Sequence, residues 1–305
     1  MAAEGLRSLI LRACYRLAPF DLRGDCQVPT VADGVAISCV INFFGRLDLL
    51  AGILYSLASQ SLSRERFEVV LVEDRGGTPG GLEMAGRFAE AMNVRYFPLD
   101  RNFGRMGYAR NFALARTRGD IVLFLDDDTV ILQETFLERM LEVFATNRET
   151  AAVVPFGQAS FSFVGDRYAF HDPYFMTSRC TAYRRQVLAE LSGFVDEFVG
   201  QEDVEYVVRF TLAGKVSKVA PELEYFHPPL TVTNLRKPMA VGYSFFLLKN
   251  RYPLFFWILL LLNCARHAPL IILPGRRNRE MGRFGFGFLR GVIDGFRGVN
   301  EQGYK

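Results

Sequence analysis

Short apolar runs alternate with stretches of helical periodicity between residues 35 and 125. Val35–Ile41, Phe67–Val72 and Ile121–Leu125 are runs of the kind found in strands buried on both faces, and Val94–Phe97 is a shorter one. Between them, apolar residues three and four positions apart predict helices around residues 50–57, 82–92 and 106–117. This β-α-β-α order predicts an α/β fold with a parallel, doubly wound sheet.

Polar side chains follow several of these predicted strands. Asn42 comes after the first, Asp74 after the second and Asp126–Asp128 after the fourth. Because ligands of doubly wound sheets bind beyond the carboxyl ends of the strands, these side chains are expected to share one edge. Adjacent carboxylates repel one another, and a hard divalent cation with oxygen ligands relieves that repulsion. The pattern predicts a metal–diphosphate site, and a solvated acidic turn is the alternative that the acids alone leave open.

Composition narrows the classes of function. A chain of 305 residues is long enough for one large α/β domain with additional segments. The net charge of +3, without zinc-finger, RNP or helix-turn-helix patterns, argues against a nucleic-acid partner. The 5 cysteines lack CxxC spacing, which is typical of reduced thiols in a cytosolic compartment. Neither a GxGxxG nor a GxxxxGKS/T loop occurs, so a metal rather than a glycine loop is expected to hold any nucleotide phosphates.

Six motifs in a fixed order resemble those of inverting family 2 glycosyltransferases with a GT-A fold. They are Val40–Arg46 (VINFFGR), Val72–Asp74 (VED), Arg101–Asn111 (RNFGRMGYARN), Gly119–Asp128 (GDIVLFLDDD), Gly193–Glu197 (GFVDE) and Gln201–Gly214 (QEDVEYVVRFTLAG). The resemblance covers residues 35–230. It rests on the order and spacing of the six motifs, because each motif alone is weak evidence for the family. The chain departs from the family around Ile41, Phe43–Phe44 and Arg75–Gly76, which concerns contacts to the nucleotide base rather than the metal or the catalytic base.

The resemblance implies roles for the polar strand ends, which would bind a nucleoside diphosphate sugar. Asp74 is expected to contact the nucleotide base, and Asn42 the nucleotide sugar. Asp126 and Asp128 are the expected ligands of Mg²⁺ or Mn²⁺, which bridges the diphosphate and neutralises the leaving nucleoside diphosphate. Asp127 lies between them and is expected to share that work or to contact the ribose.

Arg110, Asn111 and His227 complete the site that the resemblance implies. The family places Arg110 and Asn111 near the nucleotide sugar, and a guanidinium suits phosphate or sugar oxygens. A surface salt bridge is the alternative for Arg110. His227 follows a strand predicted near residues 216–226. Many GT-A enzymes complete the metal or diphosphate site with a late histidine, and a structural loop histidine is the alternative here.

Asp203 is the expected catalytic base. It opens a predicted helix, where a carboxylate is also favoured as a helix-terminal group, so capping is the rival interpretation. An inverting transfer needs a carboxylate that removes the proton of the acceptor hydroxyl during in-line attack, with no covalent glycosyl-enzyme. The neighbouring Glu202 is expected to hydrogen-bond the acceptor or to orient Asp203.

The two ends of the chain differ from its centre. Residues 1–33 are expected to form an amphipathic helix with a basic polar side and a linker, residues 34–230 the GT-A domain, and residues 231–305 a helical membrane-associated region. The alternative for the last region is a helical subdomain that covers the sheet.

Residues 254–273 are the most apolar stretch of the chain. Arg266–His267 and Pro269 interrupt the stretch after about 12 residues, short of the about 20 that a spanning helix needs. An in-plane helix or a helical hairpin therefore fits better than a single span. Residues 274–305 mix arginine with phenylalanine, which favours an anionic membrane surface.

Transfer of a sugar to a glycan acceptor is the leading hypothesis for the function. The acceptor is expected to be lipid-linked, and the protein to act at the cytoplasmic face of the cell membrane in polysaccharide or glycan biosynthesis. A sugar nucleotidyltransferase is one alternative, but Asn42–Arg46 lacks the Gly-rich loop with Arg or Lys that such enzymes carry. A catalytically inactive membrane scaffold is another, and the presence of Asp74, Asp126, Asp128 and Asp203 argues against it.

Overall fold

The centre of the structure, a computed structural model that describes residues 6–30, 34–159, 176–228 and 234–299, is a mixed sheet of seven strands. The strands are β1 (Ile37–Phe43), β2 (Phe67–Glu73), β3 (Val94–Pro98), β4 (Ile121–Asp126), β5 (Thr150–Ala159), β6 (Cys180–Arg184) and β7 (Val216–His227). Their spatial order is β3-β2-β1-β4-β6-β5-β7, and β6 runs antiparallel to both of its neighbours. The sequence predicted the parallel half, β1 to β4, and the structure confirms it.

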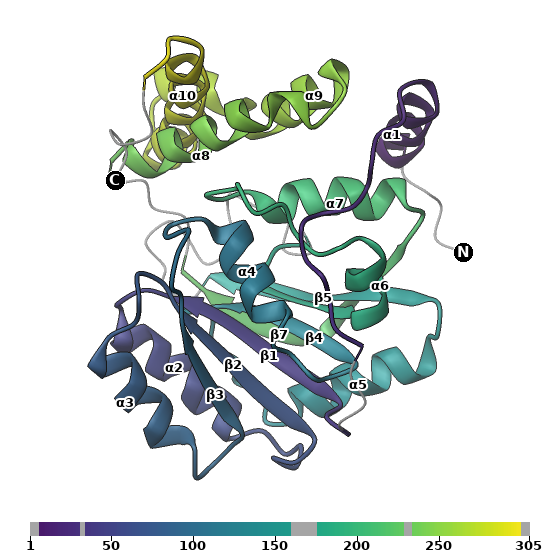
Figure 1. Cartoon of the computed structure of the whole chain (residues 1–305), viewed down its shortest axis with the longest axis vertical. Coiled ribbons are helices and arrows are strands. Elements are labelled where there is room, and N and C mark those ends of the chain that lie inside the picture. The colour runs from purple at the N-terminus through teal and green to yellow at the C-terminus, as the bar shows by residue number, and fades with distance from the viewer. Residues whose placement is uncertain (1–5, 31–33, 160–175, 229–233, 300–305) are drawn as a thin grey trace.

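Helices cover both faces of this sheet (Figure 1). On one face lie α2 (Leu47–Ala58), α3 (Pro79–Phe88) and α5 (Phe136–Thr146), and on the other lie α4 (Met106–Leu114), α6 (Arg185–Glu190) and α7 (Glu202–Leu212). Successive side chains of a strand point to opposite faces, so Ile41 joins the first core and Val40 the second. This double burial explains why the parallel strands are apolar throughout instead of alternating.

The register brings the polar strand ends together. Asn42 of β1 lies opposite Val72 of β2 on one side and opposite Asp126 of β4 on the other. The next turn is fixed by a hydrogen bond from the backbone N of Asp74 to the carbonyl oxygen of Phe43, at 2.9 Å. The carboxyl ends of β1, β2 and β4 therefore form one polar edge, as the sequence predicted.

The first and last helices of the chain form a separate layer above α7 (Figure 1). This layer contains α1 (Leu6–Leu17), α8 (Arg236–Leu247), the 3-10 helix η1 (Leu248–Asn250), α9 (Leu254–Ala265), the 3-10 helix η2 (Ala268–Ile272) and α10 (Arg276–Phe296). Its core includes Phe245, Phe256 and Phe288 and reaches down to Leu212 of α7. Gly242 allows α8 to approach α10 closely, since a Cβ there would overlap the backbone of Phe288.

This layer joins the two ends of the chain, which lie on either side of the expected boundaries at residues 33 and 230. Tyr15 and Phe20 pack against Phe256, with ring centroids 6.5 and 4.9 Å apart, so the N-terminal segment and the C-terminal helices share one core. Among the described residues, the core of this layer extends to α7 and to the loop before it. Residues 1–5, 31–33, 231–233 and 300–305 of the predicted terminal regions lie outside the described residues.

Candidate active site

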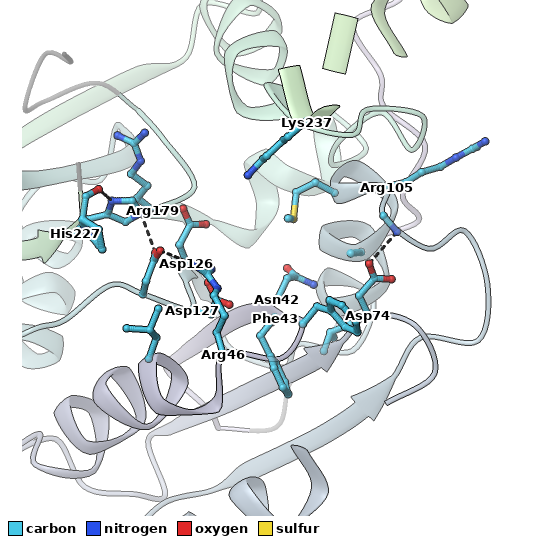
Figure 2. Close-up of a pocket in the computed structure, with 18 residues that line it drawn as sticks. Asn42, Phe43, Arg46, Asp74, Arg105, Asp126, Asp127, Arg179, His227 and Lys237 are labelled. Carbon is cyan, nitrogen blue, oxygen red and sulfur yellow. Dashed lines mark hydrogen bonds and ion pairs between the residues drawn. The ribbon is translucent and has the colours of Figure 1, made fainter. Parts of the chain in front are cut away.

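A cavity of about 620 Å³ opens at the polar edge of the sheet (Figure 2). Strand ends supply most of its polar wall, and the first turns of α4 and α8 supply the rest. The polar and aromatic lining residues are Asn42, Phe43, Phe44, Arg46, Asp74, Arg105, Asp126, Asp127, Asp128, Arg179, His227 and Lys237. The cavity thus contains carboxylates and cations from segments that are far apart in the sequence.

His227 lies beside the acidic turn, which is the name used here for Asp126–Asp128 at the end of β4. It does so because the end of β7 pairs with the residues after β4. Val130 and Phe226 exchange two backbone hydrogen bonds, each of 2.8 Å, and this places the next residue of β7 beside the acids. His227 Nε2 lies 2.9 Å from Asp128 Oδ1 and 3.4 Å from Asp126 Oδ2. Burial disfavours the charged imidazole, but the hydrogen bonds to Asp126 and Asp128 raise the pKa of His227 above its ordinary value.

The donor set of these three residues fits a divalent metal. One ligand atom from each of Asp126, Asp128 and His227 lies within 4.8 Å of the others. His227 Nδ1 lies 2.6 Å from the carbonyl oxygen of Pro228, which can only accept a hydrogen bond, so Nδ1 carries a proton and Nε2, which faces the two carboxylates, is the nitrogen that would bind a metal. Two carboxylates with one imidazole suit Mn²⁺ or Mg²⁺.

Arg46 is held against the same acids by a left-handed turn after β1. Gly45 and Arg46 have φ values of 61° and 47°, and the turn points the guanidinium at the acidic turn. Arg46 forms ion pairs with Asp127 and, at 3.0 Å, with Asp128. Burial raises the pKa of Asp127 to about 7; Arg46 opposes this rise, and the charges of Asp128 and Asp126 add to it. Asp127 therefore pairs with Arg46 and is not one of the three candidate metal ligands, Asp126, Asp128 and His227.

Arg110 links the acidic turn to the start of α7. Its side chain is 4% exposed, and it donates to Glu202 Oε1 at 2.7 Å and to Asp126 Oδ1 at 3.1 Å. The surface salt bridge considered as an alternative is therefore wrong for Arg110, because the pair with Glu202 is buried. The carboxylate of Glu202 accepts the hydrogen bond from Arg110 and does not line the cavity. Glu202 therefore fixes the position of Arg110 instead of facing a ligand.

Asp203 is a half-buried carboxylate next to this pair. Its Oδ2 accepts a hydrogen bond from the backbone N of Ser178 at 3.3 Å, and its Oδ1 accepts from the N of Val204 at 2.8 Å. The second bond satisfies one amide of the first helical turn, whereas the N-cap position itself belongs to Gln201. Burial raises the pKa of Asp203 above its ordinary range, and Asp126 adds to the rise, which suits a proton acceptor.

Asp74 and Asn42 form the wall nearest β2. Asp74 Oδ2 accepts from the backbone N of Gly104, and its Oδ1 accepts from the N of Arg75, both at 2.8 Å. Asn42 lies on the cavity wall with both amide atoms buried and without a hydrogen-bond partner among the described residues. Buried polar atoms of this kind are expected to be satisfied by a ligand or by water.

The amide of Asn111, a residue expected near the nucleotide sugar, is held by the loop before α7. Its amide nitrogen donates to the carbonyl oxygen of Phe194 at 2.8 Å and to Asp196 Oδ1 at 2.7 Å, and its oxygen accepts from Phe194 N at 2.8 Å. The residue does not line the cavity. Asn111 thus fastens the loop before α7 onto α4, because a buried amide with three local partners has little capacity left for a ligand.

Sequence reasoning missed the cations of the cavity. Arg46 lies inside the quoted Val40–Arg46 motif, so that motif carried the available signal. Arg105 precedes α4, Arg179 precedes β6, and Lys237 comes from the first turn of α8 and points into the cavity (Figure 2). No motif marked Lys237, because only the packing of the C-terminal helices brings it to this edge.

Comparison with known proteins agrees with this geometry. The model for glycosyl transferase family 2 matches residues 38–192. The chain is 33% identical over 98 residues to the poly(ribitol-phosphate) β-N-acetylglucosaminyltransferase TarS of Staphylococcus aureus, a match that covers 32% of this chain and 17% of TarS. It is 22% identical over 199 residues to the O-antigen chain rhamnosyltransferase RfbN of Salmonella typhimurium, which covers 58% of this chain and 62% of RfbN. The chain therefore spans less than two thirds of the length of either relative.

Solved structures show the same fold. The mannosyltransferase PcManGT of Pyrobaculum calidifontis, solved with GDP-Man and Mn²⁺, gives a TM-score of 0.59 at 14% identity and covers 96% of this chain and 97% of its own. Residues 1–349 of TarS from S. aureus, solved with UDP-GlcNAc, give 0.53 at 17% identity, with 87% and 84% covered. These likenesses establish the GT-A fold.

Proposed function

The chain belongs to glycosyl transferase family 2 and has a GT-A fold, and we propose that it transfers a sugar from a nucleoside diphosphate sugar to a glycan acceptor with inversion at the anomeric carbon. One observation carries the proposal. A metal-ligating set, Asp126, Asp128 and His227, is joined through Arg110 to Glu202, the residue next to the half-buried Asp203. A metal–diphosphate site beside a carboxylate of raised pKa is what a single displacement requires.

The metal would be held by Asp126, Asp128 and His227. When bound there, a divalent cation neutralises the diphosphate and lowers the energy of the departing nucleoside diphosphate. Asp74 accepts a hydrogen bond from the nucleotide base, and the unpartnered amide of Asn42 binds the nucleotide sugar. The Mn²⁺ and GDP-Man of PcManGT and the UDP-GlcNAc of TarS support a metal and a nucleoside diphosphate sugar for this chain.

Asp203 acts as the general base. It removes the proton of the acceptor hydroxyl while that oxygen bonds to the anomeric carbon, and the bond from this carbon to the diphosphate oxygen breaks. One displacement inverts the configuration and leaves no sugar on the enzyme. Arg110 and Glu202 hold the acidic turn and the start of α7 in a fixed relation, which keeps the base and the diphosphate site at a constant separation.

We propose a lipid-linked glycan acceptor at the cytoplasmic face of the cell membrane. The names of TarS and RfbN, which concern poly(ribitol phosphate) and O-antigen chains, support a cell-envelope polysaccharide. Leu254–Ile272, which is 19 residues long and 28% buried, supports the membrane, because by length and composition it is apolar enough to cross one.

Release of nucleoside diphosphate from a panel of UDP-, GDP- and TDP-sugars tests this proposal. We expect metal-dependent release from one class of donor, lost on Asp128→Ala and Asp203→Asn. Asp120→Asn is the matched control, because this exposed aspartate precedes β4 at the opposite edge of the sheet. No release from any of these donors, together with pyrophosphate release from a nucleoside triphosphate and a sugar 1-phosphate, would identify a nucleotidyltransferase. Unchanged turnover in Asp128→Ala and Asp203→Asn would refute the assigned roles.

A further inference from the structure

Helix α1 has two apolar rows but only one of them is covered. Leu11, Cys14 and Tyr15 pack on the core shared with the C-terminal helices. Leu9, Ile10 and Leu17, which lie on another side of the helix, are 50, 51 and 88% exposed. A helix that merely packs on its own protein turns its polar side outward, so this exposed row indicates a contact with something apolar.

Helix α9 repeats this arrangement. Phe256, Trp257 and Leu260 fill the same core, each less than 8% exposed. The opposite row, spaced four residues apart along the helix, is open: Leu254 is 68% exposed, Ile258 41% and Leu262 60%. Beyond the helix, Ile272 of η2 is 82% exposed. The most apolar stretch of the chain therefore has an uncovered side along its whole length.

The two exposed rows belong to one end of the molecule. Tyr15 of α1 and Phe256 of α9 lie in edge contact, and Phe20 packs against both Phe256 and Tyr252. Figure 1 shows α1 and α9 at the end of the molecule that lies above α7. We use the name docking face for Leu9, Ile10, Leu17, Leu254, Ile258, Leu262 and Ile272.

The charge around the docking face favours an anionic lipid surface over a second copy of the chain as its partner. Residues 6–17 and 254–279 contain no Asp or Glu. Arg12 donates to the carbonyl oxygen of Thr211 in α7 at 3.1 Å, and the other cationic side chains that the structure describes in these segments are Arg16, Arg266, His267 and Arg279. Arg16 and Arg266 are exposed at the edge of the apolar rows. A second copy of the chain would set these cations against each other, whereas an anionic lipid surface attracts them and takes up the apolar side chains.

The length of α9 decides how the face meets the bilayer. Its 12 residues rise about 18 Å, and Arg266 and His267 follow before η2 begins. The hydrocarbon core is about 30 Å thick, so α9 alone is too short to cross it. The longer stretch Leu254–Ile272 could cross by length and composition, but it contains Arg266, His267 and Pro269. A short amphipathic helix with cations at its edge lies in the plane of the interface.

We propose that α1 and α9–η2 together form one in-plane membrane-docking face for an anionic bilayer, which presents a lipid-linked acceptor to Asp203. This inference rests on the acceptor class in the proposed function. Cys264 of α9 lies with its Sγ 3.8 Å from Gln201 Oε1, and Gln201 is the N-cap of the helix that carries Asp203. The helix that touches lipid therefore also touches the start of α7, and Lys237 of the same layer lines the cavity.

Sedimentation with lipid vesicles tests the docking face without requiring transfer activity. The vesicles are phosphatidylcholine alone and phosphatidylcholine with one third phosphatidylglycerol. We expect binding to the anionic vesicles. Each of Leu17→Glu and Leu254→Glu should lower the partition coefficient by at least about tenfold, because each removes an exposed leucine that the bilayer would bury and adds repulsion from the anionic lipid. Leu132→Glu is the matched control: Leu132 has the same 68% exposure as Leu254 but lies after β4.

Several results would overturn the inference. They are equal binding of the wild type to neutral and anionic vesicles, unchanged binding of Leu17→Glu, or a lipid-free dimer that Leu254→Glu converts to a monomer. The last of these would assign the face to a second copy of the chain. Donor turnover of the same variants in detergent reports separately on the proposed function, so failure of docking and failure of transfer are distinguishable.

Discussion

Replacement of Arg110 by Met tests the link between the acidic turn and α7. The substitution leaves the carboxylate of Glu202, which is 4% exposed, without its partner, and it removes one contact from Asp126. Removing one member of a buried ion pair costs about 3–5 kcal/mol, a large share of a typical unfolding free energy of about 5–15 kcal/mol. The Asp126 contact contributes less, because that side chain is 31% exposed.

These magnitudes predict a large thermal effect that a second substitution reverses. At about 1.6 °C per kcal/mol for a chain of 305 residues, Arg110→Met should lower the Tm by roughly 5–8 °C. Arg110→Met/Glu202→Gln removes the unpaired charge and should recover more than half of that loss, while kcat stays low because Asp126 still lacks the guanidinium. Thermal unfolding by circular dichroism and donor turnover of both variants provide the test. A single variant within about 2 °C of wild type, or a double variant no more stable than the single one, would refute the reasoning.

Three further predictions concern the metal, the base and the fold. His227→Ala should raise at least about tenfold the metal concentration that gives half-maximal nucleotide binding, and unchanged metal dependence would remove His227 from the ligands. Because burial raises the pKa of Asp203 and only its ionised form accepts a proton, kcat/KM should fall as the pH drops through that raised pKa and level off above it. Asp203→Asn should abolish this acidic limb, and a variant that keeps it would point to another base. Asn111→Ala loses three hydrogen bonds and should cost about 2–4 kcal/mol of stability with donor affinity retained, whereas weaker donor binding at unchanged Tm would restore a direct contact.

The parallel half of the fold was predictable because local and tertiary signals agree there. Strands such as Ile121–Asp126 are buried on both faces, so their apolar runs are unmistakable, and the acids that follow them are excluded from the core. The same rule that places ligands at strand ends located Asp126, Asp128 and Asp74 on one cavity. By contrast, the short β6 pairs between β4 and β5 through long-range contacts that no local pattern records.

The roles of residues that depend on tertiary packing could not be predicted from the sequence. Lys237 reaches the cavity only because α8 is held by α10 and α7, and Arg46 because a left-handed turn redirects it. Asn111 lies in the motif that suggested a nucleotide contact, yet the loop at Phe194 takes its amide. The contact between α1 and α9 could not be predicted either, because it rests on aromatic contacts such as that between Tyr15 and Phe256, which are far apart in the sequence.

Turnover of a nucleoside diphosphate sugar by the wild type and by Asp203→Asn is the most direct test of the central claim. With the matching donor, an acceptor glycan and Mn²⁺, the account predicts release of the nucleoside diphosphate together with a product of inverted anomeric configuration. Asp203→Asn should bind the donor normally but turn over about 10²–10⁴-fold more slowly, the usual contribution of a general base. A product of retained configuration, or an Asp203→Asn variant as fast as wild type, would contradict the account.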